Sequence, residues 1–513
     1  MKFLFPIFNH CGMLTSMHLE SATYTLTLSP DVLASLPESV QSHIRFLEIN
    51  LQQTQIALQQ LQIRVQELEA KLAKNSSNSG KPPSSDGLKR PPKSERTSSG
   101  RKPGGQEGRI GKNLVQVGDP DHVKIHTPMN CQGCGFNLSN ISGSVAEARQ
   151  VFDIPKPVVE VTEHQAEKKT CPCCGCVSRG VFPEDIKAPV QYGQRVQALA
   201  TYFSHQHFIP VERLGQIFED VFGIGISPGT CANIDEKLFK NLEIFEAGLK
   251  AYLIAERILH FDETGMRCEK KLQWVHIAAS ESAALYIIHS KRGLEAMDEM
   301  GILPQFHGSA IHDHWFPYFS YQQVTHGLCN AHHLREFTFV YEQEKEEWAK
   351  HMKTLLLKAN NRVEKFRQQG FLPQEELLEL EQEYTRIITE GIAYHAQLPP
   401  LPKGKRGKRK QRDGKNLLDR LVKKQACVLL FMYDFSAPFT NNLGEQGIRM
   451  VKLKQKIGGC FRTLRGGQIF CRIRSYLATA RKQGWDIWDA LADAIRGTPW
   501  LLSSPAHAQT IPA

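Results

Sequence analysis

The sequence predicts an α/β protein made of several domains. Its 513 residues are more than one ordinary hydrophobic core accommodates, and a hydrophobic fraction of 41% is enough to build several cores. Four β-rich runs between residues 258 and 313 predict a sheet, and helical periodicity on both sides of them predicts the surrounding helices. A heptad pattern and two pairs of closely spaced cysteines add a coiled coil and a small metal-binding unit.

Charge and cysteine content indicate the class of binding partner and the redox state of the compartment. The chain carries 63 Lys and Arg residues against 53 Asp and Glu residues, a formal net charge of +10, which favours a polyanionic partner. Its 13 cysteines are odd in number, and four of them lie between residues 171 and 176, which indicates thiols and metal ligands rather than a disulfide scaffold. We therefore expect a reducing, cytoplasmic location. No run of about 18 apolar residues is present, so we expect no membrane span.

Residues 1–39 give no clear structural prediction, whereas residues 40–75 predict one long coiled-coil helix. Apolar side chains recur there in alternating steps of three and four, which is the spacing of a coiled-coil seam. The seam consists of Ile44, Leu47, Leu51, Thr54, Leu58, Leu61, Val65, Leu68 and Leu72. A helix with so narrow an apolar stripe gains most by pairing with a copy of itself, so we expect a homo-oligomer. A helix packed on its own domain is the alternative.

Residues 76–114 are rich in Ser, Pro, Gly and cations, which predicts a basic disordered linker. Such a segment buries too little apolar surface to offset the entropy lost on ordering it. A cationic arm of this kind neutralises phosphates without reading a base sequence. A solvated tether without contacts is the alternative.

Residues 115–180 predict a small zinc-binding domain. Two CxxC pairs are each followed by a glycine that eases a tight turn, and together they offer four thiolates to one structural Zn²⁺. The candidate ligands are Cys131, Cys134, Cys171 and Cys174. Cys173 and Cys176 form a competing second pair, so the register there stays open. Between the two pairs, residues 158–164 predict a strand.

Residues 188–250 predict a helical region. Within it, residues 211–234 fit a helix, a glycine-containing turn and a second helix, and Ser227-Pro228 suits the start of the second helix. This pattern is typical of a helix-turn-helix that binds DNA. Two ordinarily packed helices are the alternative.

Residues 251–465 predict the main α/β domain. Short β-rich runs at 258–264, 272–279 and 284–288, a helix at 293–300 and a fourth run at 309–313 follow one another along the chain. This order opens an RNase H-like mixed sheet, in which an acid inside the first strand and an acid ending the fourth lie side by side. A third acid is expected on a later helix. The three candidates are Asp262, Asp313 and Glu445.

Helices are also expected around this sheet. Charge patterns predict a helical insertion over residues 340–430, and residues 466–513 predict a C-terminal helical element. Three carboxylates suit two Mg²⁺ or Mn²⁺ ions, because hard divalent cations prefer carboxylate oxygens. Two ions about 3.5–4 Å apart serve the attacking and the leaving oxygen of a phosphodiester.

Two groups of cations are candidates for contact with a DNA backbone. Three of them fall on the helical face of the third acid, and four form a dense basic loop inside the insertion. The first group is Arg449, Lys452 and Lys456, and the second is Lys405, Arg406, Lys408 and Arg409. A solvated loop is the alternative for the second group.

Several ordered motifs resemble the transposases of the insertion sequence 66 family, over nearly the whole chain. They are Lys81-Pro82-Pro83-Ser84-Ser85-Asp86, Gly104-Gly105-Gln106, the two CxxCG segments, Asp262-Glu263-Thr264, Lys291-Arg292-Gly293, His312-Asp313, Cys329-Asn330-Ala331-His332, Pro438-Phe439-Thr440-Asn441-Asn442 and the segment 454–463. The resemblance implies an RNase H-like core, a DDE triad at Asp262, Asp313 and Glu445, a zinc-binding domain and an N-terminal helical region. It implies a bacterial enzyme that cuts DNA at transposon ends and joins the freed 3′-hydroxyl to target DNA, with element-encoded accessory proteins.

The sequence departs from this family at the third acid. The family has Arg directly after the Glu, whereas this chain has Gln446, and Gly444 and Gly447 each cost about 1 kcal/mol of helix propensity. A decayed copy, acting as a zinc-containing DNA-binding regulator without chemistry, is therefore the alternative, and a host nuclease of the same fold is a third possibility. We expect Cys329 and His332 to lie near the active site as a packed thiol and a hydrogen-bonded imidazole rather than as a second metal site.

Overall fold

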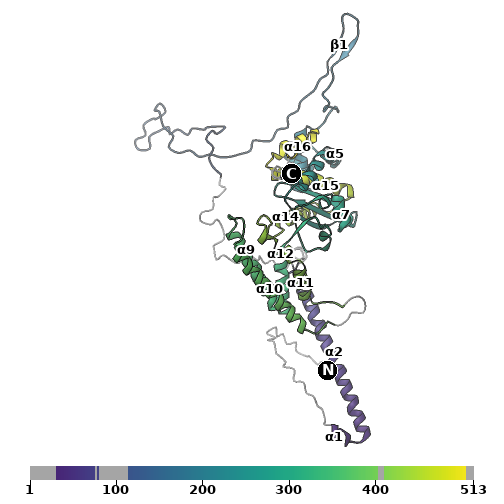
Figure 1. Cartoon of the computed structure of the whole chain (residues 1–513). Helices are drawn as coiled ribbons and strands as arrows, with labels where there is room; N and C mark the ends of the chain where they lie inside the picture. Colours follow the sequence, from purple (N-terminus) through teal and green to yellow (C-terminus); the bar gives the residue numbers. More distant parts are fainter. Residues whose placement is uncertain (1–29, 76–77, 80–113, 402–408, 504–513) are drawn as a thin grey trace, which may run out of the picture. The chain divides into compact units, whose positions relative to one another are not determined.

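A computed structural model describes residues 30–75, 78–79, 114–401 and 409–503 of the protein (Figure 1). The chain divides into two compact units, Met1–Ala73 and Lys74–Ala513, and each is described by itself. Most of the predicted basic linker lies outside the described residues. Within the described ranges, no helix is both long enough and apolar enough to cross a membrane.

The first unit consists of the short helix α1 (Pro30–Ala34) and the long helix α2 (Glu38–Ala73). The predicted long helix is thus present. Its seam side chains from Leu47 to Leu72 are 44–87% exposed where they are large and apolar. The hydroxyl of Thr54 donates to the Asn50 carbonyl at 2.7 Å, so the one polar seam residue is satisfied within its own helix. An apolar stripe in water lacks the tertiary packing that stabilises most protein helices.

The segment from residue 114 to residue 190 contains little regular structure. Strands β1 (Lys168–Thr170) and β2 (Val177–Arg179) form an antiparallel hairpin around the second cysteine pair. The strand predicted over residues 158–164 is wrong, because those residues have no regular structure. Val158 and Val161 are 86% and 88% exposed. Alternating β-branched residues do not make a strand without a neighbouring strand to pair with.

A mixed five-stranded sheet in the order β5-β4-β3-β6-β7 is the centre of the second unit. The strands are β3 (Ile258–Cys268), β4 (Lys271–Ala279), β5 (Ala284–His289), β6 (Ser309–His312) and β7 (Thr325–Leu328). The first three form an antiparallel meander, whereas β6 pairs parallel to β3 and β7 pairs parallel to β6. Helix α7 (Leu294–Met300) connects β5 toward β6. The four predicted strands and the predicted helix are therefore present.

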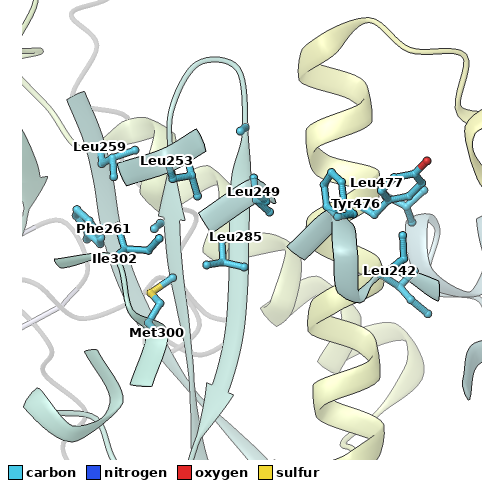
Figure 2. Close-up of a cluster of buried hydrophobic side chains, with 14 of the residues drawn as sticks. Leu242, Leu249, Leu253, Leu259, Phe261, Leu285, Met300, Ile302, Tyr476 and Leu477 are labelled. Atoms are coloured by element: carbon cyan, nitrogen blue, oxygen red, sulfur yellow. The ribbon is translucent and has the colours of Figure 1, made fainter. Parts of the chain in front are cut away.

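Alternating residues of β3 face two different cores. Leu259 and Phe261 pack with Leu249 and Leu253 of helix α6 (Glu243–Ile254), as Figure 2 shows. On the opposite face, the α14 (Asn442–Gly458) residues Ile448 and Val451 pack in one cluster with the sheet. That cluster includes Met266, Val275, Ile277, Tyr286 and Ile288. The sheet is consequently covered on both faces, and α14 lies against β3 and β4.

Helix α15 (Leu464–Gln483) protects the outer edge of the sheet. The backbone N–H of Tyr286 donates to the Ser475 hydroxyl at 2.8 Å, and that of Ala284 donates to the Thr479 hydroxyl at 3.2 Å. An edge strand with free N–H groups invites pairing with other chains, so these two hydroxyls also remove an aggregation hazard. Tyr476 and Leu477 of the same helix enter the core drawn in Figure 2.

Further helices precede and follow the sheet along the chain. The preceding ones are α3 (Gln194–Thr201), the π-helix η2 (Tyr202–Gln206), α4 (Val211–Phe222), α5 (Pro228–Asn241) and α6. The last one is α16 (Ile487–Arg496), which packs on α3 and α5. The residues predicted as an insertion are helical as well. The predicted insertion, residues 340–430, contains the π-helix η5 (Val340–Glu344), α9 (Glu347–Lys365), α10 (Gln374–Gln397), α11 (Asp413–Lys423) and α12 (Gln425–Val428). Helix α8 (Asn330–Phe339) precedes it, and α13 (Leu430–Tyr433) begins at its last residue.

Candidate functional site: three carboxylates at the end of the sheet

The register of the two central strands brings the first two acids together. Strand β3 pairs with β6 up to His260 and Ile311. Asp262 and Asp313 each lie two residues beyond this last pair. Side chains two positions apart on a strand lie on the same face, so Asp262 projects from the face on which α14 packs. Glu445 lies in the first turn of α14.

The charges of the other two acids act on Asp262, while among the described residues the three carboxylates are not gathered within 4.8 Å of one another. Burial raises the pKa of the Asp262 carboxyl well above its usual range, and nearby negative charges raise it further. Those charges belong to Glu263, Asp313 and Glu445. Burial and the Glu263 charge also raise the pKa of Asp313, while His332 and Arg292 act in the opposite direction. Burial and mutual repulsion both disfavour the ionised form of these carboxylates, and a bound cation would stabilise that form.

Asn441 ties the start of α14 to strand β3. Its side-chain Oδ1 accepts a hydrogen bond from His260 Nδ1 at 2.8 Å, and its amide Nδ2 donates to the Phe261 carbonyl at 2.7 Å. The Asn441 carbonyl accepts the Glu445 N–H at 3.0 Å. Asn441 is 2% exposed, so these bonds are shielded from water. Asn441 thereby positions the first turn of α14, which carries Glu445, relative to strand β3, which carries Asp262. Sequence reasoning gave Asn441 no role, although the Asn441-Asn442 pair was a signal.

The two glycines beside Glu445 allow α14 to approach the sheet closely. A Cβ added at Gly447 would lie 2.2 Å from Ile277 Cδ1 and 3.1 Å from the Tyr286 hydroxyl. A Cβ added at Gly444 would lie 2.9 Å from the Asn441 side chain. The helix is continuous through both glycines. Their helix-propensity cost thus accompanies close packing, and they give no support to the idea of a decayed copy.

An ion pair between the buried Glu263 and the partly exposed Arg292 lies beside the acids, with Glu263 on the other face of β3. Arg292 donates to Glu263 Oε1 from two nitrogens, at 2.9 and 2.6 Å, and the Tyr318 hydroxyl donates to Glu263 Oε2 at 2.6 Å. The Glu263 side chain is 1% exposed. The guanidinium lies 4.0 Å from the centre of the Trp315 ring, and the backbone N–H of Trp315 donates to Asp313 Oδ1 at 2.9 Å. Glu263 and Arg292 therefore support the loop that carries Asp313, a role that the sequence analysis missed.

Cys329 and His332 lie next to Glu445. Cys329 Sγ and His332 Nδ1 are each 3.8 Å from Glu445 Oε1, and the three atoms lie within 4.8 Å of one another. Burial, with the Glu445 charge, raises the pKa of the Cys329 thiol to about 12. The expected packed thiol is present. The imidazole differs from expectation, because its buried Nδ1 has no hydrogen-bond partner.

The two cysteine pairs adopt the same turn. Gly135 N–H donates to the Cys131 carbonyl at 2.9 Å, and Gly175 N–H donates to the Cys171 carbonyl at the same distance. Both glycines have positive φ, at 77° and 72°. Backbone N–H groups within each turn lower the pKa of its first thiol. Among the described residues, the four candidate ligands are not gathered within 4.8 Å of one another.

The predicted DNA-binding cations differ in their surroundings. Arg449 is 67% exposed and pairs with Glu445 at 3.2 Å, and Lys456 is exposed. Lys452 donates to the Gly265 carbonyl, and burial lowers its pKa. Arg409 is exposed. The other predicted loop cations, Lys405, Arg406 and Lys408, lie outside the described residues.

Helices α4 and α5 have the predicted helix–turn–helix form. Gly223 ends α4 in the left-handed conformation, and the Ser227 hydroxyl accepts the Thr230 N–H at 3.0 Å to begin α5. Cys231, Ile234 and Leu238 are the buried face of α5, while its first residues are exposed.

Comparisons with known families agree with this arrangement. The family described as Transposase IS66 family matches residues 189–469, which is more than half of the 513 residues and includes all three acids. The zinc-finger binding domain of transposase IS66 matches residues 128–175, which include both cysteine pairs. A family of unknown function, DUF6444, matches residues 36–114. A comparison with curated proteins finds no match. The chain therefore belongs to the IS66 family of transposases.

Proposed function

We propose that the protein is a DDE-type DNA transposase whose catalytic domain has an RNase H-like fold. In this proposal it binds transposon ends, cuts a DNA strand and transfers the freed 3′-hydroxyl to target DNA. What supports the proposal is the position of each acid: Asp262 lies on β3, Asp313 directly follows the neighbouring strand β6, Glu445 lies in the first turn of α14, and the charges of the last two act on Asp262. The strand order, with a three-stranded meander followed by two parallel strands, supports the fold assignment.

The residues present fit hard divalent cations. The three carboxylates offer oxygen ligands; burial raises the pKa of Asp262 most, and the charges of Glu263, Asp313 and Glu445 raise it further. We propose that Asp262, Asp313 and Glu445 hold two Mg²⁺ or Mn²⁺ ions. When bound, such ions neutralise the developing charge on the attacking and leaving oxygens of a phosphodiester.

The chain's own side chains position the acids and the DNA. Asn441 and the Arg292–Glu263 pair hold α14 and the loop after β6 in place. Glu445, in the first turn of a helix, lies where the helix dipole stabilises an anion. Arg335 lies 3.8 Å from Glu445, and the exposed Arg449, which pairs with Glu445 at 3.2 Å, would exchange this partner for a phosphate. We propose backbone contacts for Arg449, Lys456 and Arg409, and DNA contact for the exposed start of α5.

The remaining parts would serve assembly. We propose that Cys131, Cys134, Cys171 and Cys174 hold one structural Zn²⁺, because the identical turns of the two pairs favour this register over Cys173 with Cys176. We propose that the exposed seam of α2 pairs with a second copy of the chain, because a stripe of leucines repeated at heptad spacing fits its own copy.

Substitution of one acid tests the proposal. Asp313→Asn keeps the shape of the side chain and removes its charge, so DNA binding should persist while strand cutting with Mg²⁺ falls by at least about a hundredfold. End-labelled transposon DNA measures the cutting, and a gel-shift assay measures the binding. Glu295→Gln, an exposed acid on α7, is the matched control and should cut normally. Undiminished cutting by Asp313→Asn would refute the proposal, and wild-type binding without cutting would favour an inert regulator.

A further inference from the structure

Three potential metal ligands of different chemistry meet at the start of α8. Cys329 Sγ and His332 Nδ1 each lie 3.8 Å from Glu445 Oε1. Bonds of about 2.0–2.3 Å to a tetrahedral zinc ion place its ligand atoms about 3.3–3.8 Å apart. The three atoms are already close to that spacing. In the described part of the chain, no other group of three or more His, Cys, Asp or Glu ligand atoms lies within 4.8 Å of one another.

The imidazole of His332 has a nitrogen that lacks a partner. His332 Nδ1 is shielded from solvent and makes no hydrogen bond, and its distance from Glu445 Oε1 exceeds that of a hydrogen bond. Buried polar nitrogens are rarely left unsatisfied in proteins, so an orphan of this kind needs an explanation. A cation between the imidazole and the carboxylate would take up its lone pair.

Backbone N–H groups surround Cys329 Sγ and would stabilise a metal-bound thiolate, whereas burial and the Glu445 charge raise the pKa of the thiol without a metal. The Asn441 N–H donates to Cys329 Sγ at 3.1 Å, and the backbone N–H groups of Ala331 and His332 also point at the sulfur. Cys329 caps α8, a helix of ten residues, so the positive end of the helix dipole adds to these bonds. Backbone donors of this kind orient a metal ligand from its outer shell.

We infer that Cys329, His332 and Glu445 bind one borderline-soft divalent cation, such as Zn²⁺ or Co²⁺. One thiolate, one imidazole and one carboxylate favour such an ion over Mg²⁺. On binding, the Cys329 sulfur forms a bond to the cation and its proton leaves to solvent. Three protein ligands leave a fourth position open to water.

This site shares one ligand with the proposed magnesium centre. An ion held by Cys329 and His332 engages the Glu445 carboxylate, so zinc should oppose Mg²⁺-dependent cutting. That consequence, unlike the binding itself, rests on the proposed function. The site would then work as a brake whose strength follows the zinc concentration.

Cobalt titration of the full chain tests the site without DNA or Mg²⁺. The background variant replaces by serine all six cysteines of the two turns, which are Cys131, Cys134, Cys171, Cys173, Cys174 and Cys176. In this background we expect a thiolate-to-cobalt absorption band whose intensity corresponds to one thiolate-bound Co²⁺ per chain. Cys329→Ser should abolish the band, and His332→Gln should weaken binding by at least about tenfold, the lower bound known for loss of an outer-shell partner. Cys427→Ser, on α12, is the matched control and should leave the band unchanged.

Two outcomes would overturn the inference. One is cobalt binding in the background variant without a thiolate band, and the other is a band that persists in Cys329→Ser. Circular dichroism checks that each variant is folded, and His332→Gln is expected to fold because the replaced Nδ1 has no partner. Failure of the proposed function would appear separately, as lack of Mg²⁺-dependent cutting by the unaltered chain.

Discussion

Asn441 connects the start of α14 to strand β3 and to Cys329, close to the candidate acids. It connects α14 to His260 and to the Phe261 carbonyl on β3, and its own N–H reaches Cys329. We expect Asn441→Ala to lower the free energy of unfolding by about 1–3 kcal/mol for each buried group left without a partner. Cutting should fall more than DNA binding, because Glu445 loses its anchor.

The neighbouring Asn442 offers a control for this prediction. Asn442 is exposed at the first position of α14, so Asn442→Ala should change both quantities little. Urea unfolding and the end-labelled cutting assay measure the two effects. Equal stability and equal cutting in Asn441→Ala would mean that the helix is held in place by packing alone.

His276 provides a pH-dependent contribution to stability. Burial is the main cause that lowers its pKa from 6.5 to about 4 in the folded protein, and His289 and Arg292 add to the effect. The unfolded chain therefore binds more protons than the folded one between these values, so stability is lost as the pH falls below about 6.5. The loss should approach about 1.4 kcal/mol per pH unit. Unfolding at about pH 7 and about pH 5 should show a smaller difference for His276→Gln; an identical difference would contradict the assignment.

Helix α14 contains two glycines that lower its helix propensity but allow it to pack closely against the sheet. We expect Gly447→Ala to destabilise the protein by about 1–3 kcal/mol, because the added methyl overlaps Ile277 Cδ1. Gly248→Ala is the matched control, since Gly248 is exposed within α6 and its Cβ would meet nothing within 4 Å. That substitution should instead stabilise by up to about 1 kcal/mol. Thermal unfolding distinguishes the two, and stabilisation of both would show that α14 does not pack closely here.

The sequence predicted most elements of the sheet and missed those with weak local signals. Strands β3 to β6 alternate or are continuously apolar, so their pattern located them. Strand β7, Thr325–Leu328, is four residues long, contains a glycine and depends on distant pairing with β6. The strand predicted over residues 158–164 had the right pattern and no partner strand. Periodicity reports which residues prefer a strand, whereas pairing decides which residues form one.

The sequence identified the three candidate acids, but it did not identify the residues that hold them in position. Strand positions located Asp262 and Asp313, because parallel neighbours bring equivalent positions together. Helix periodicity placed Lys452 beside Arg449, yet it could not reveal that the Lys452 ammonium meets the Gly265 carbonyl. The Arg292–Glu263 ion pair joins residues that are 29 positions apart, so no local sequence pattern predicts it.

At the scale of the whole molecule, the first unit is expected to determine the oligomeric state. Replacing Leu51 and Leu58 of α2 by Lys places two charges on the exposed seam, so the dimer should dissociate. Gln53→Lys, off the seam on the same helix, should have no effect. Analytical ultracentrifugation measures the mass in each case. An unchanged mass in the double variant would place the contact between copies elsewhere.

Iron-directed cleavage of the protein backbone tests most directly whether the three acids share one metal centre. Fe²⁺ replaces Mg²⁺ in the purified chain, and peroxide then generates hydroxyl radicals that cut the backbone near the bound ion. We predict cuts close to Asp262, Asp313 and Glu445 together, suppressed by excess Mg²⁺ and by Asp313→Asn. Cuts near the first two acids with none in α14, or cuts that Mg²⁺ does not suppress, would contradict the shared centre.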